Sequence, residues 1–198
     1  MSATPKHRDA IVDTSVALFR RQGYSATGLN DIVEHSGAPK GSLYHYFPRG
    51  KSSIAEAAVR EAGKRVADTI RKLAAEASSS GELLVAHAKL LSRWMKQSNF
   101  RDGCPITTVL LELAPADEGV TSAGREAYAA RQQVFTERLI ADGVVPERAR
   151  RLAILCSAAL QGALIQARVE RSGAPILAAA EELALLLPNS ASKRRRAA

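Results

Sequence analysis

Residues 27–47 read TGLNDIVEHSGAPKGSLYHYF, and this stretch decides the fold. It holds one short helical pattern, a glycine at Gly37, and a second short pattern that ends at Phe47 before Pro48. Two short helices joined by a tight turn with glycine form a helix-turn-helix, which places its second helix in the major groove of DNA. The stretch therefore predicts a small helical DNA-binding head.

The second segment of this motif is rich in side chains that can reach DNA. A cation, hydroxyls and an imidazole on one helix can contact both phosphates and base edges. Leu43 and Phe47, four residues apart, are expected to hold that helix to the core. Thr27 is expected to cap the first helix, and Lys51 lies where a fourth begins, so both can meet a phosphate. The predicted DNA-binding residues are Thr27, Pro39, Lys40, Gly41, Ser42, Tyr44, His45, Tyr46 and Lys51.

The rest of the chain also reads as helix. Apolar residues recur every three or four positions over long stretches, and aromatic residues make up only 5% of the chain. This pattern favours amphipathic helices over strands, so we expect an all-α fold of about nine helices. They are expected at residues 9–22, 28–36, 41–47, 52–77, 83–95, 105–113, 121–141, 146–171 and 176–187.

Positive charge is concentrated at the two ends of the chain. Residues 1–72 carry 12 Lys and Arg against 7 Asp and Glu, whereas residues 73–192 carry 12 against 13. Residues 193–196, KRRR, supply the rest of the net charge of +8. A cationic first third beside a near-neutral body favours contact with a polyanion such as nucleic acid, although a solubilising surface is the alternative.

Several classes of protein find no support in the sequence. No apolar run approaches the roughly 20 residues that span a bilayer, and no secretory signal is seen, so we expect a cytoplasmic protein without a membrane partner. The four histidines stand alone and no catalytic signature is present, so we expect no enzyme. Two cysteines are too few for a disulfide framework or a zinc cluster, and we expect neither metal nor cofactor.

The head resembles a known family signature. The residues that resemble the N-terminal signature of the TetR family of repressors are Thr27, Ile32, Gly37, Lys40–Phe47 and Lys51. The resemblance implies a three-helix head, a recognition helix around residues 39–46, and a larger helical C-terminal domain that dimerises and binds an inducer. Pro39 departs from the family pattern, where Ser or Thr is commoner, so a hydroxyl contact to phosphate is expected to be missing.

A second resemblance lies in the C-terminal part, which is similar to the TetR subgroup related to the LmrA and YxaF repressors. The residues that carry it are Gly103-Cys104-Pro105, Leu111-Glu112, Gln161-Gly162-Ala163 and Arg168. We therefore expect three regions. They are a helix-turn-helix DNA-binding domain at 1–51, a helical ligand-binding and dimerisation domain at 52–188, and a basic disordered tail at 189–198.

The predicted function is that of a ligand-responsive repressor. The eighth expected helix is dense with small residues and the ninth is apolar, so both are expected to pair with their mates in a homodimer. A twofold dimer predicts a palindromic double-stranded operator, and a ligand that tilts the fourth helix would release it. One tryptophan and few charges favour a planar or aromatic, largely apolar small-molecule inducer. The candidate ligand-binding residues are Trp94, Met95, Cys104, Leu110, Tyr128, Phe135 and Cys156.

Three alternatives stay open at this stage. Each candidate ligand-binding residue also suits ordinary core packing. Cys104 precedes a proline at an expected helix start, where the helix dipole favours a reactive thiolate, so a redox-sensing repressor is a second hypothesis. A general nucleic-acid-binding protein would use the same basic head without needing a palindrome.

Overall fold

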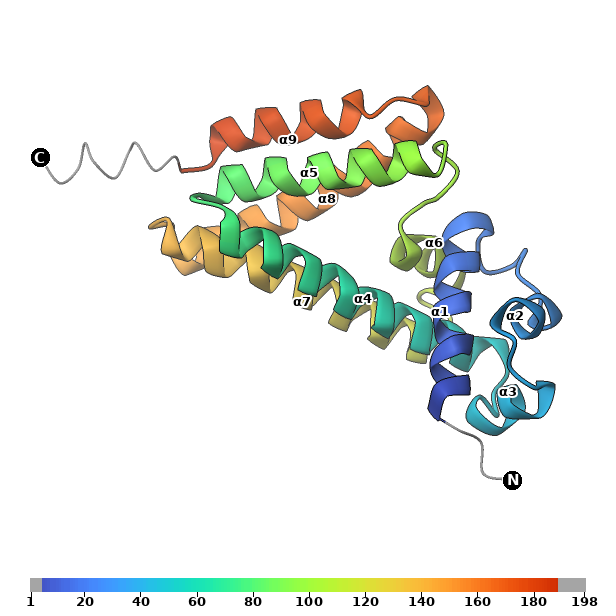
Figure 1. Ribbon diagram of the computed structural model, residues 1–198. Helices are drawn as coiled ribbons and strands as arrows, with labels where there is room; N and C mark the ends of the chain where they lie inside the picture. Colours follow the sequence, from blue (N-terminus) through green and yellow to red (C-terminus); the bar gives the residue numbers. More distant parts are fainter. Residues whose placement is uncertain (1–4, 189–198) are drawn as a thin grey trace, which may run out of the picture. The chain divides into compact units, whose positions relative to one another are not determined.

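The structure, a computed structural model, describes residues 5–188 (Figure 1). Over these residues it consists of nine α-helices and has no strand, so the predicted all-α fold is confirmed. The predicted basic tail, 189–198, lies outside the described residues. The helices are α1 Pro5–Gln22, α2 Leu29–Ser36, α3 Lys40–Tyr46, α4 Lys51–Glu76, α5 Ser80–Gln97, α6 Pro105–Leu113, α7 Glu118–Ala141, α8 Pro146–Glu170 and α9 Ala174–Leu186.

The turns around α2 follow from glycines. Gly23 ends α1 with a φ of 85°, and Gly37 ends α2 with a φ of 63°, a left-handed conformation that glycine adopts without cost. The expectation that Thr27 caps α2 is wrong, because the N-cap is Gly28. The side chain of Asp31 takes over the capping role, since its Oδ2 accepts a hydrogen bond from Gly28 N at 2.9 Å.

The described chain divides into two compact units. The first comprises the residues up to Arg65 together with Gly103–Tyr128, and the second comprises Val66–Asp102 and the residues from Ala129 onward. This division differs from the expected boundary at residue 51, because α6 and the first part of α7 belong with the head. A predicted DNA-binding domain at 1–51 stays a prediction about function.

The first unit is held by the contacts of α1. Ile11 and Phe19 on α1 are fully buried, together with Ile32 of α2 and Leu43 of α3. The same helix packs against α6. Burial of large apolar side chains on three short helices fixes the head, at about 1.5–3 kcal/mol for each side chain.

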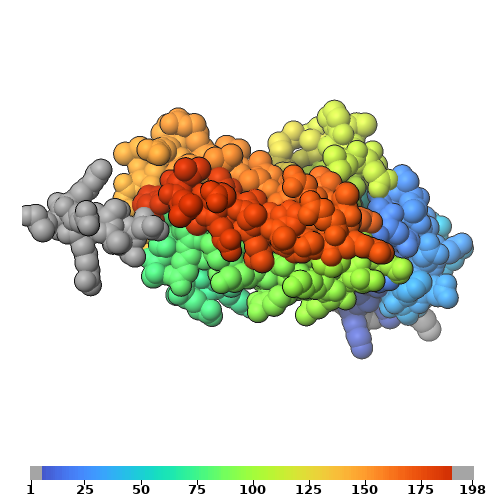
Figure 2. All heavy atoms as spheres, turned by 90° about the horizontal axis from the view of Figure 1, so that it is seen from above, coloured from blue at the N-terminus to red at the C-terminus, as the bar shows by residue number. Residues whose placement is uncertain are grey.

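The second unit is built on α5, α8 and α9. Figures 1 and 2 show α9 lying along α5, and α9 also packs on α8. Large buried side chains such as Leu83, Phe135 and Ile176 come from different helices. On α8 the buried positions include many alanines, which allow neighbouring helices to approach closely.

By length and hydropathy alone, α8 is long and apolar enough to cross a membrane. The sequence was expected to hold no such run, so this finding differs from that expectation. A core helix of small and apolar residues passes the same test, but only 33% of the apolar window is buried inside the second unit, and Ile154, Ile165 and Val169 are exposed. The contacts of α8 with α9 are those of such a helix.

Candidate nucleic-acid interface

The outer face of α3 presents polar side chains to solvent. Lys40, Tyr44 and His45 are exposed, and the exposed fraction of Tyr44 is 51%. On the opposite face Leu43 and Phe47 are buried, as the four-residue spacing predicts. The helix is therefore anchored on one side and offers a cation, a phenol and an imidazole on the other.

Three of the predicted DNA-binding side chains point inward instead. Thr27 is fully buried, and its Oγ1 donates a hydrogen bond to Gly23 O at 2.7 Å. Ser42 is buried, and the hydroxyl of Tyr46 is buried with no hydrogen-bond partner among the described residues. In this conformation these three side chains support the motif, while Pro39, Lys40, Gly41, Tyr44 and His45 form its exposed face.

A carboxylate from α6 holds the turn that leads into α2. Glu112 Oε1 accepts a hydrogen bond from Tyr24 N at 2.7 Å, and its Oε2 accepts one from Ser25 N at 2.8 Å. We call these two bonds the Glu112 clamp. A Cβ at Gly23 would lie 2.6 Å from Glu112 Oε1, so only glycine leaves room for the carboxylate. Bonds from backbone N–H groups to a charged acceptor are among the stronger hydrogen bonds.

Lys51 completes this arrangement. Its Nζ lies 4.2 Å from the centre of the Tyr24 ring and 3.5 Å from Ser25 O. Burial lowers the pKa of Lys51, and the nearby Glu112 carboxylate opposes that shift. Burial also raises the pKa of Glu112, but the bonds from Ser25 and Tyr24 and the charge of Lys51 outweigh it, so the pKa is lowered overall. Lys51, predicted to bind phosphate, thus lies beside the turn that leads from α1 into α2.

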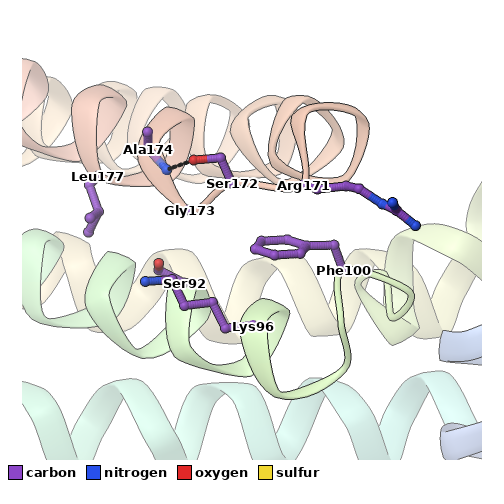
Figure 3. A pocket seen from close by; sticks show the side chains of 8 residues that line it. All are labelled: Ser92, Lys96, Phe100, Arg171, Ser172, Gly173, Ala174 and Leu177. Atoms are coloured by element: carbon purple, nitrogen blue, oxygen red, sulfur yellow. Dashed lines mark hydrogen bonds between the residues drawn. The ribbon is translucent and has the colours of Figure 1, made fainter.

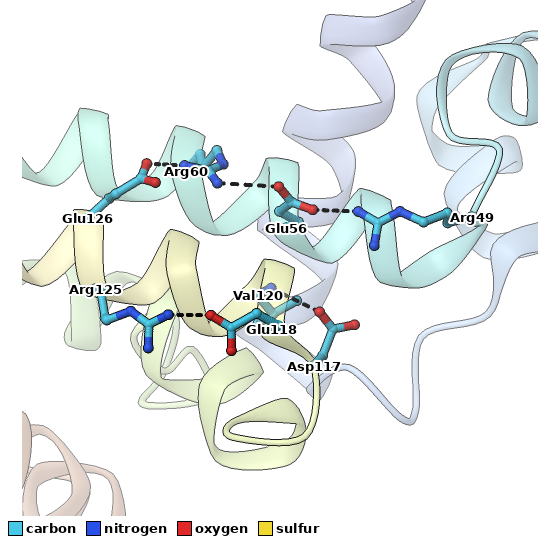
Figure 4. A network of polar contacts seen from close by, with 8 residues as sticks. All are labelled: Arg49, Glu56, Arg60, Asp117, Glu118, Val120, Arg125 and Glu126. Atoms are coloured by element: carbon cyan, nitrogen blue, oxygen red, sulfur yellow. Dashed lines mark hydrogen bonds and ion pairs between the residues drawn. The ribbon is translucent and has the colours of Figure 1, made fainter.

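A second set of polar contacts joins α4 to α7 within the first unit (Figure 4). Arg49 donates to Glu56 at 2.6 Å, Arg60 donates to Glu56 at 3.3 Å, and Arg60 also pairs with Glu126. At the start of α7, Asp117 Oδ1 accepts from Val120 N at 2.9 Å and its Oδ2 accepts from the Ser52 hydroxyl.

The bond from Ser52 is the main reason why the pKa of Asp117 is lowered. The first turn of α4 is therefore tied to the start of α7, and the third turn of α4 to the third turn of α7. These ties lie next to the Glu112 clamp in the chain, since α6 leads directly into α7.

The seven candidate ligand-binding residues are divided between the two units. In the first, Leu110 packs against Gly124, where a Cβ would meet Leu110 Cδ2 at 2.6 Å, and Tyr128 Oη lies 3.3 Å from Thr107 Oγ1. Cys104 is the partly exposed N-cap of α6. In the second unit Met95, Phe135 and Cys156 are buried, whereas 41% of Trp94 is exposed, so that unit does not enclose the indole.

The interior of the second unit also holds polar side chains. His87 is 5% exposed, its ring centre lies 6.1 Å from that of Phe135, and its Nδ1 has no hydrogen-bond partner in the described part of the chain. Burial, assisted by the charge of Arg131, lowers the pKa of His87 to about 4. Arg131 Nη2 donates to Ser157 Oγ at 2.5 Å. Burial likewise raises the pKa of Cys156 to about 11, so its thiol stays protonated.

An exposed recognition helix on a three-helix head, followed by helices alone, defines the class of helix-turn-helix DNA-binding regulators. Residues 11–58 match the family model described as bacterial regulatory proteins, tetR family. Residues 80–182 match the C-terminal domain of LmrA/YxaF-like transcriptional regulators. The chain belongs to the TetR family of transcriptional regulators, which are not enzymes, and both resemblances seen in the sequence are confirmed.

Individual relatives agree with this assignment. The chain is 37% identical over 174 residues to an uncharacterized HTH-type transcriptional regulator of Mycobacterium tuberculosis, covering 85% of this chain and 88% of that protein. It is 32% identical over 187 residues to the HTH-type transcriptional regulator YxaF of Bacillus subtilis, covering 94% and 98%. Over 53 residues, 27% of this chain and 28% of that protein, it is 40% identical to the biofilm operon icaADBC negative transcriptional regulator IcaR of Staphylococcus aureus.

Solved structures show the same fold. The crystal structure of the regulatory protein TetR from Rhodobacter sphaeroides aligns with a TM-score of 0.79 at 19% identity, covering 90% of this chain and 97% of that one. Regulators of this family bind DNA and typically act as dimers with a ligand. Sequence reasoning did not assign the Glu112 clamp, since Glu112 entered only through the subgroup resemblance and its partners lie 87 and 88 residues away.

Proposed function

We propose that the protein is a dimeric repressor that acts in the cytoplasm, binds a palindromic operator through α3, and is released by a small apolar or aromatic inducer. The observation that carries this proposal is the exposed face of α3, where Lys40, Tyr44 and His45 stand over the buried Leu43 and Phe47. Such a face can make both phosphate and base contacts in a major groove. The negative regulator IcaR, similar over the head, supports repression.

Dimerisation is proposed through α8 and α9. The outer face of α8 carries an exposed stripe of apolar and small residues at helical spacing, and Leu185 of α9 is exposed as well. A contiguous exposed apolar face of this kind marks an interaction site, and a second copy of the chain is the occupant that twofold operators require. The stripe, hereafter the α8 stripe, comprises Ile154, Ala158, Gly162, Ile165 and Val169.

Release by ligand is proposed as a shift between two states. α4 and α7 each contribute residues to both compact units, so a ligand that favours a tilted α4 in the second unit also favours a displaced head. The Glu112 clamp and the contacts of Lys51 would carry that displacement to α2 and α3. The proposed ligand contacts remain Trp94, Met95, Cys104, Leu110, Tyr128, Phe135 and Cys156.

The test is footprinting and fluorescence anisotropy of the full chain on the DNA upstream of its own gene, at two salt concentrations with nonspecific competitor. A protected palindrome that survives competition supports the proposal, and candidate aromatic compounds are then screened for release. Binding that competitor removes completely, with only a steep dependence on salt, would assign the head to general nucleic-acid binding instead.

The dimer is tested separately by Ile165→Glu, which buries a charge if the α8 stripe is an interface. We expect sedimentation to show a monomer and operator affinity to fall by more than tenfold. Ile140→Glu on α7, where the parent side chain is 42% exposed outside the stripe, is the matched control and should remain a dimer. A dimer that tolerates Ile165→Glu would contradict the proposed interface.

A second candidate function is redox-sensing repression through Cys104. The observation that favours it is the position of Cys104, partly exposed at the N-cap of α6, the helix that carries Glu112. Cys156, by contrast, is fully buried. If operator binding responds to peroxide, Cys104→Ser should abolish the response while Cys156→Ser keeps it, and a response that survives Cys104→Ser excludes this candidate.

A further inference from the structure

A cavity in the second unit lies where the C-terminal end of α5 faces the turn between α8 and α9 (Figure 3). Its volume is about 400 Å³, which is within the usual range for small-molecule sites. None of the proposed DNA or inducer contacts lines it, and neither does the α8 stripe. Its lining residues include Ser92, Lys96, Phe100, Arg171, Gly173 and Leu177.

The charge of this cavity is positive. Its lining includes two cations, Lys96 and Arg171, and no carboxylate. Neither cation forms an ion pair with another residue in the part of the chain that the structure describes. In Figure 3 the Lys96 side chain extends toward Ser92, whereas Arg171 extends toward the opposite end. The cavity therefore favours an anion beside Lys96, with Arg171 adding to the field at its outer end.

Ser92 supplies a polar group that lacks a partner. The residue is only 5% exposed, and its hydroxyl makes no hydrogen bond within the described residues. Buried polar side chains ordinarily have a partner, so an unpaired hydroxyl on a cavity wall is a ready donor for a ligand oxygen. Together with Lys96 it provides two donors on one side of the cavity.

Gly173 keeps this hydroxyl open to the cavity. Its φ of −79° and ψ of −5° are accessible to any residue, so the backbone does not require glycine at this position. A Cβ there would lie 2.0 Å from Ser92 Oγ. Any larger residue would therefore displace the hydroxyl. Gly173 is also the N-cap of α9 and provides no side-chain cap, so the positive end of that helix dipole borders the cavity.

Two apolar side chains border opposite ends of the cavity. Phe100 enters the cavity from the loop after α5, and Leu177 borders it from α9 (Figure 3). Phe100 has a φ of 57°, a left-handed conformation that is unusual for a bulky side chain and persists only where the surrounding structure holds it. The backbone that carries this ring is thus held in one conformation.

We propose that this cavity binds a small aromatic carboxylate. The carboxylate accepts hydrogen bonds from the Lys96 ammonium and the Ser92 hydroxyl, and the aromatic ring packs against Phe100. This site requires neither DNA nor the proposed inducer contacts, so it goes beyond the repressor function and can fail without affecting it.

The test is a titration of the full chain with benzoate, followed by calorimetry and by NMR shifts of the cavity residues. We expect saturable binding of benzoate and no binding of benzamide, the neutral analogue, over the same concentrations. Lys96→Gln should weaken benzoate binding at least tenfold. Lys89→Gln, which removes an exposed cation from the same helix outside the cavity, is the matched control and should bind as the parent does.

Gly173→Ala provides a second variant, because its Cβ displaces the Ser92 hydroxyl without changing charge. We expect it to lose benzoate binding, while thermal unfolding shows that Lys96→Gln is as stable as the parent. The proposal is overturned if benzoate does not saturate, or if both variants bind it as the parent does. Inorganic phosphate that binds as tightly as benzoate would also overturn it, since the ring would then contribute nothing.

Discussion

Among the described residues, the second compact unit buries ionisable side chains and the first does not. In the first unit, carboxylates and cations meet at the surface and join segments far apart in the sequence, as Glu112 does with Tyr24 and Ser25. In the second unit, His87 and Arg131 lie buried among apolar side chains. Exposed polar contacts contribute little to stability, whereas buried ones are costly to disturb. Substitutions in the first unit should therefore alter DNA binding, and those in the second should alter stability.

The largest expected effect is on the core of the second unit. Phe135→Ala removes a side chain that is 1% exposed and should lower the free energy of unfolding by about 3–5 kcal/mol. Ile140→Ala, on the same helix but 42% exposed, is the control and should cost under about 1 kcal/mol. Denaturant titration measures both. If both variants lose the same free energy of unfolding, burial of Phe135 does not contribute more to stability than the exposed Ile140 does.

The second largest effect is expected on the pH dependence of stability, which buried His87 gives to the second unit. The pKa of His87 is lowered to about 4 in the folded protein, so between about 6.5 and that value the unfolded chain binds more protons. The contribution of neutral His87 is complete above the ordinary pKa and is lost as the pH falls toward 4. The slope is at most about 1.4 kcal/mol per pH unit. Unfolding titrations at several pH values should show that His87→Leu removes this slope, and an unchanged slope would refute the assignment.

A pair of tyrosines tests the recognition face. Tyr44→Ala should weaken operator binding by about 1–3 kcal/mol, or roughly 5- to 150-fold, with little change in stability, because that side chain is exposed. Tyr46→Phe removes only a buried hydroxyl that lacks a partner, so affinity should be retained and stability should stay the same or rise. Anisotropy and thermal unfolding measure the two effects. If both variants lose the same operator affinity, Tyr44 is not distinguished from Tyr46 as the residue that contacts DNA.

The smallest effect is expected at the Glu112 clamp. Glu112→Gln keeps the shape but removes the charge, and should cost about 1 kcal/mol of stability or less and several-fold in operator affinity. Glu118→Gln, which affects only an exposed pair with Arg125, is the control. Because the pKa of Glu112 is lowered, the contribution of the clamp is complete above the ordinary value of about 4.3 and is lost as the pH falls below it. If Glu112→Gln leaves operator affinity unchanged, the clamp has a structural role only and does not affect DNA binding.

Periodicity predicted the helices closely because it depends on residues near each other in the chain. The expected helix at 105–113 agrees with α6, and the expected start at Pro146 agrees with α8. Chain ends and caps were less predictable. Thr27 was expected as an N-cap, but its hydroxyl bonds back to Gly23 O and leaves the cap to Gly28.

The DNA-binding and ligand-binding residues were harder to predict from the sequence, because the burial of a side chain depends on segments that are distant in the chain. Lys40, Tyr44 and His45 were correctly predicted to be exposed on α3, but Ser42 and the Tyr46 hydroxyl, predicted to reach DNA, are buried. Nothing local indicates that Glu112 meets Tyr24, or that Trp94 stays exposed while Phe135 is enclosed. Those outcomes depend on which helices pack together.

The close approach at Gly23 has a consequence for how relatives of this chain diverge. The left-handed φ of 85° at this position admits asparagine or aspartate best after glycine, but a Cβ there would lie 2.6 Å from the Glu112 carboxylate. Either residue at position 23 would push the Glu112 carboxylate out of its present position, so the clamp would be lost and the side chain at position 112 would be free to change. Across homologous sequences, positions 23 and 112 should therefore change together. Such covariation would indicate that the two positions are in contact in the relatives as well.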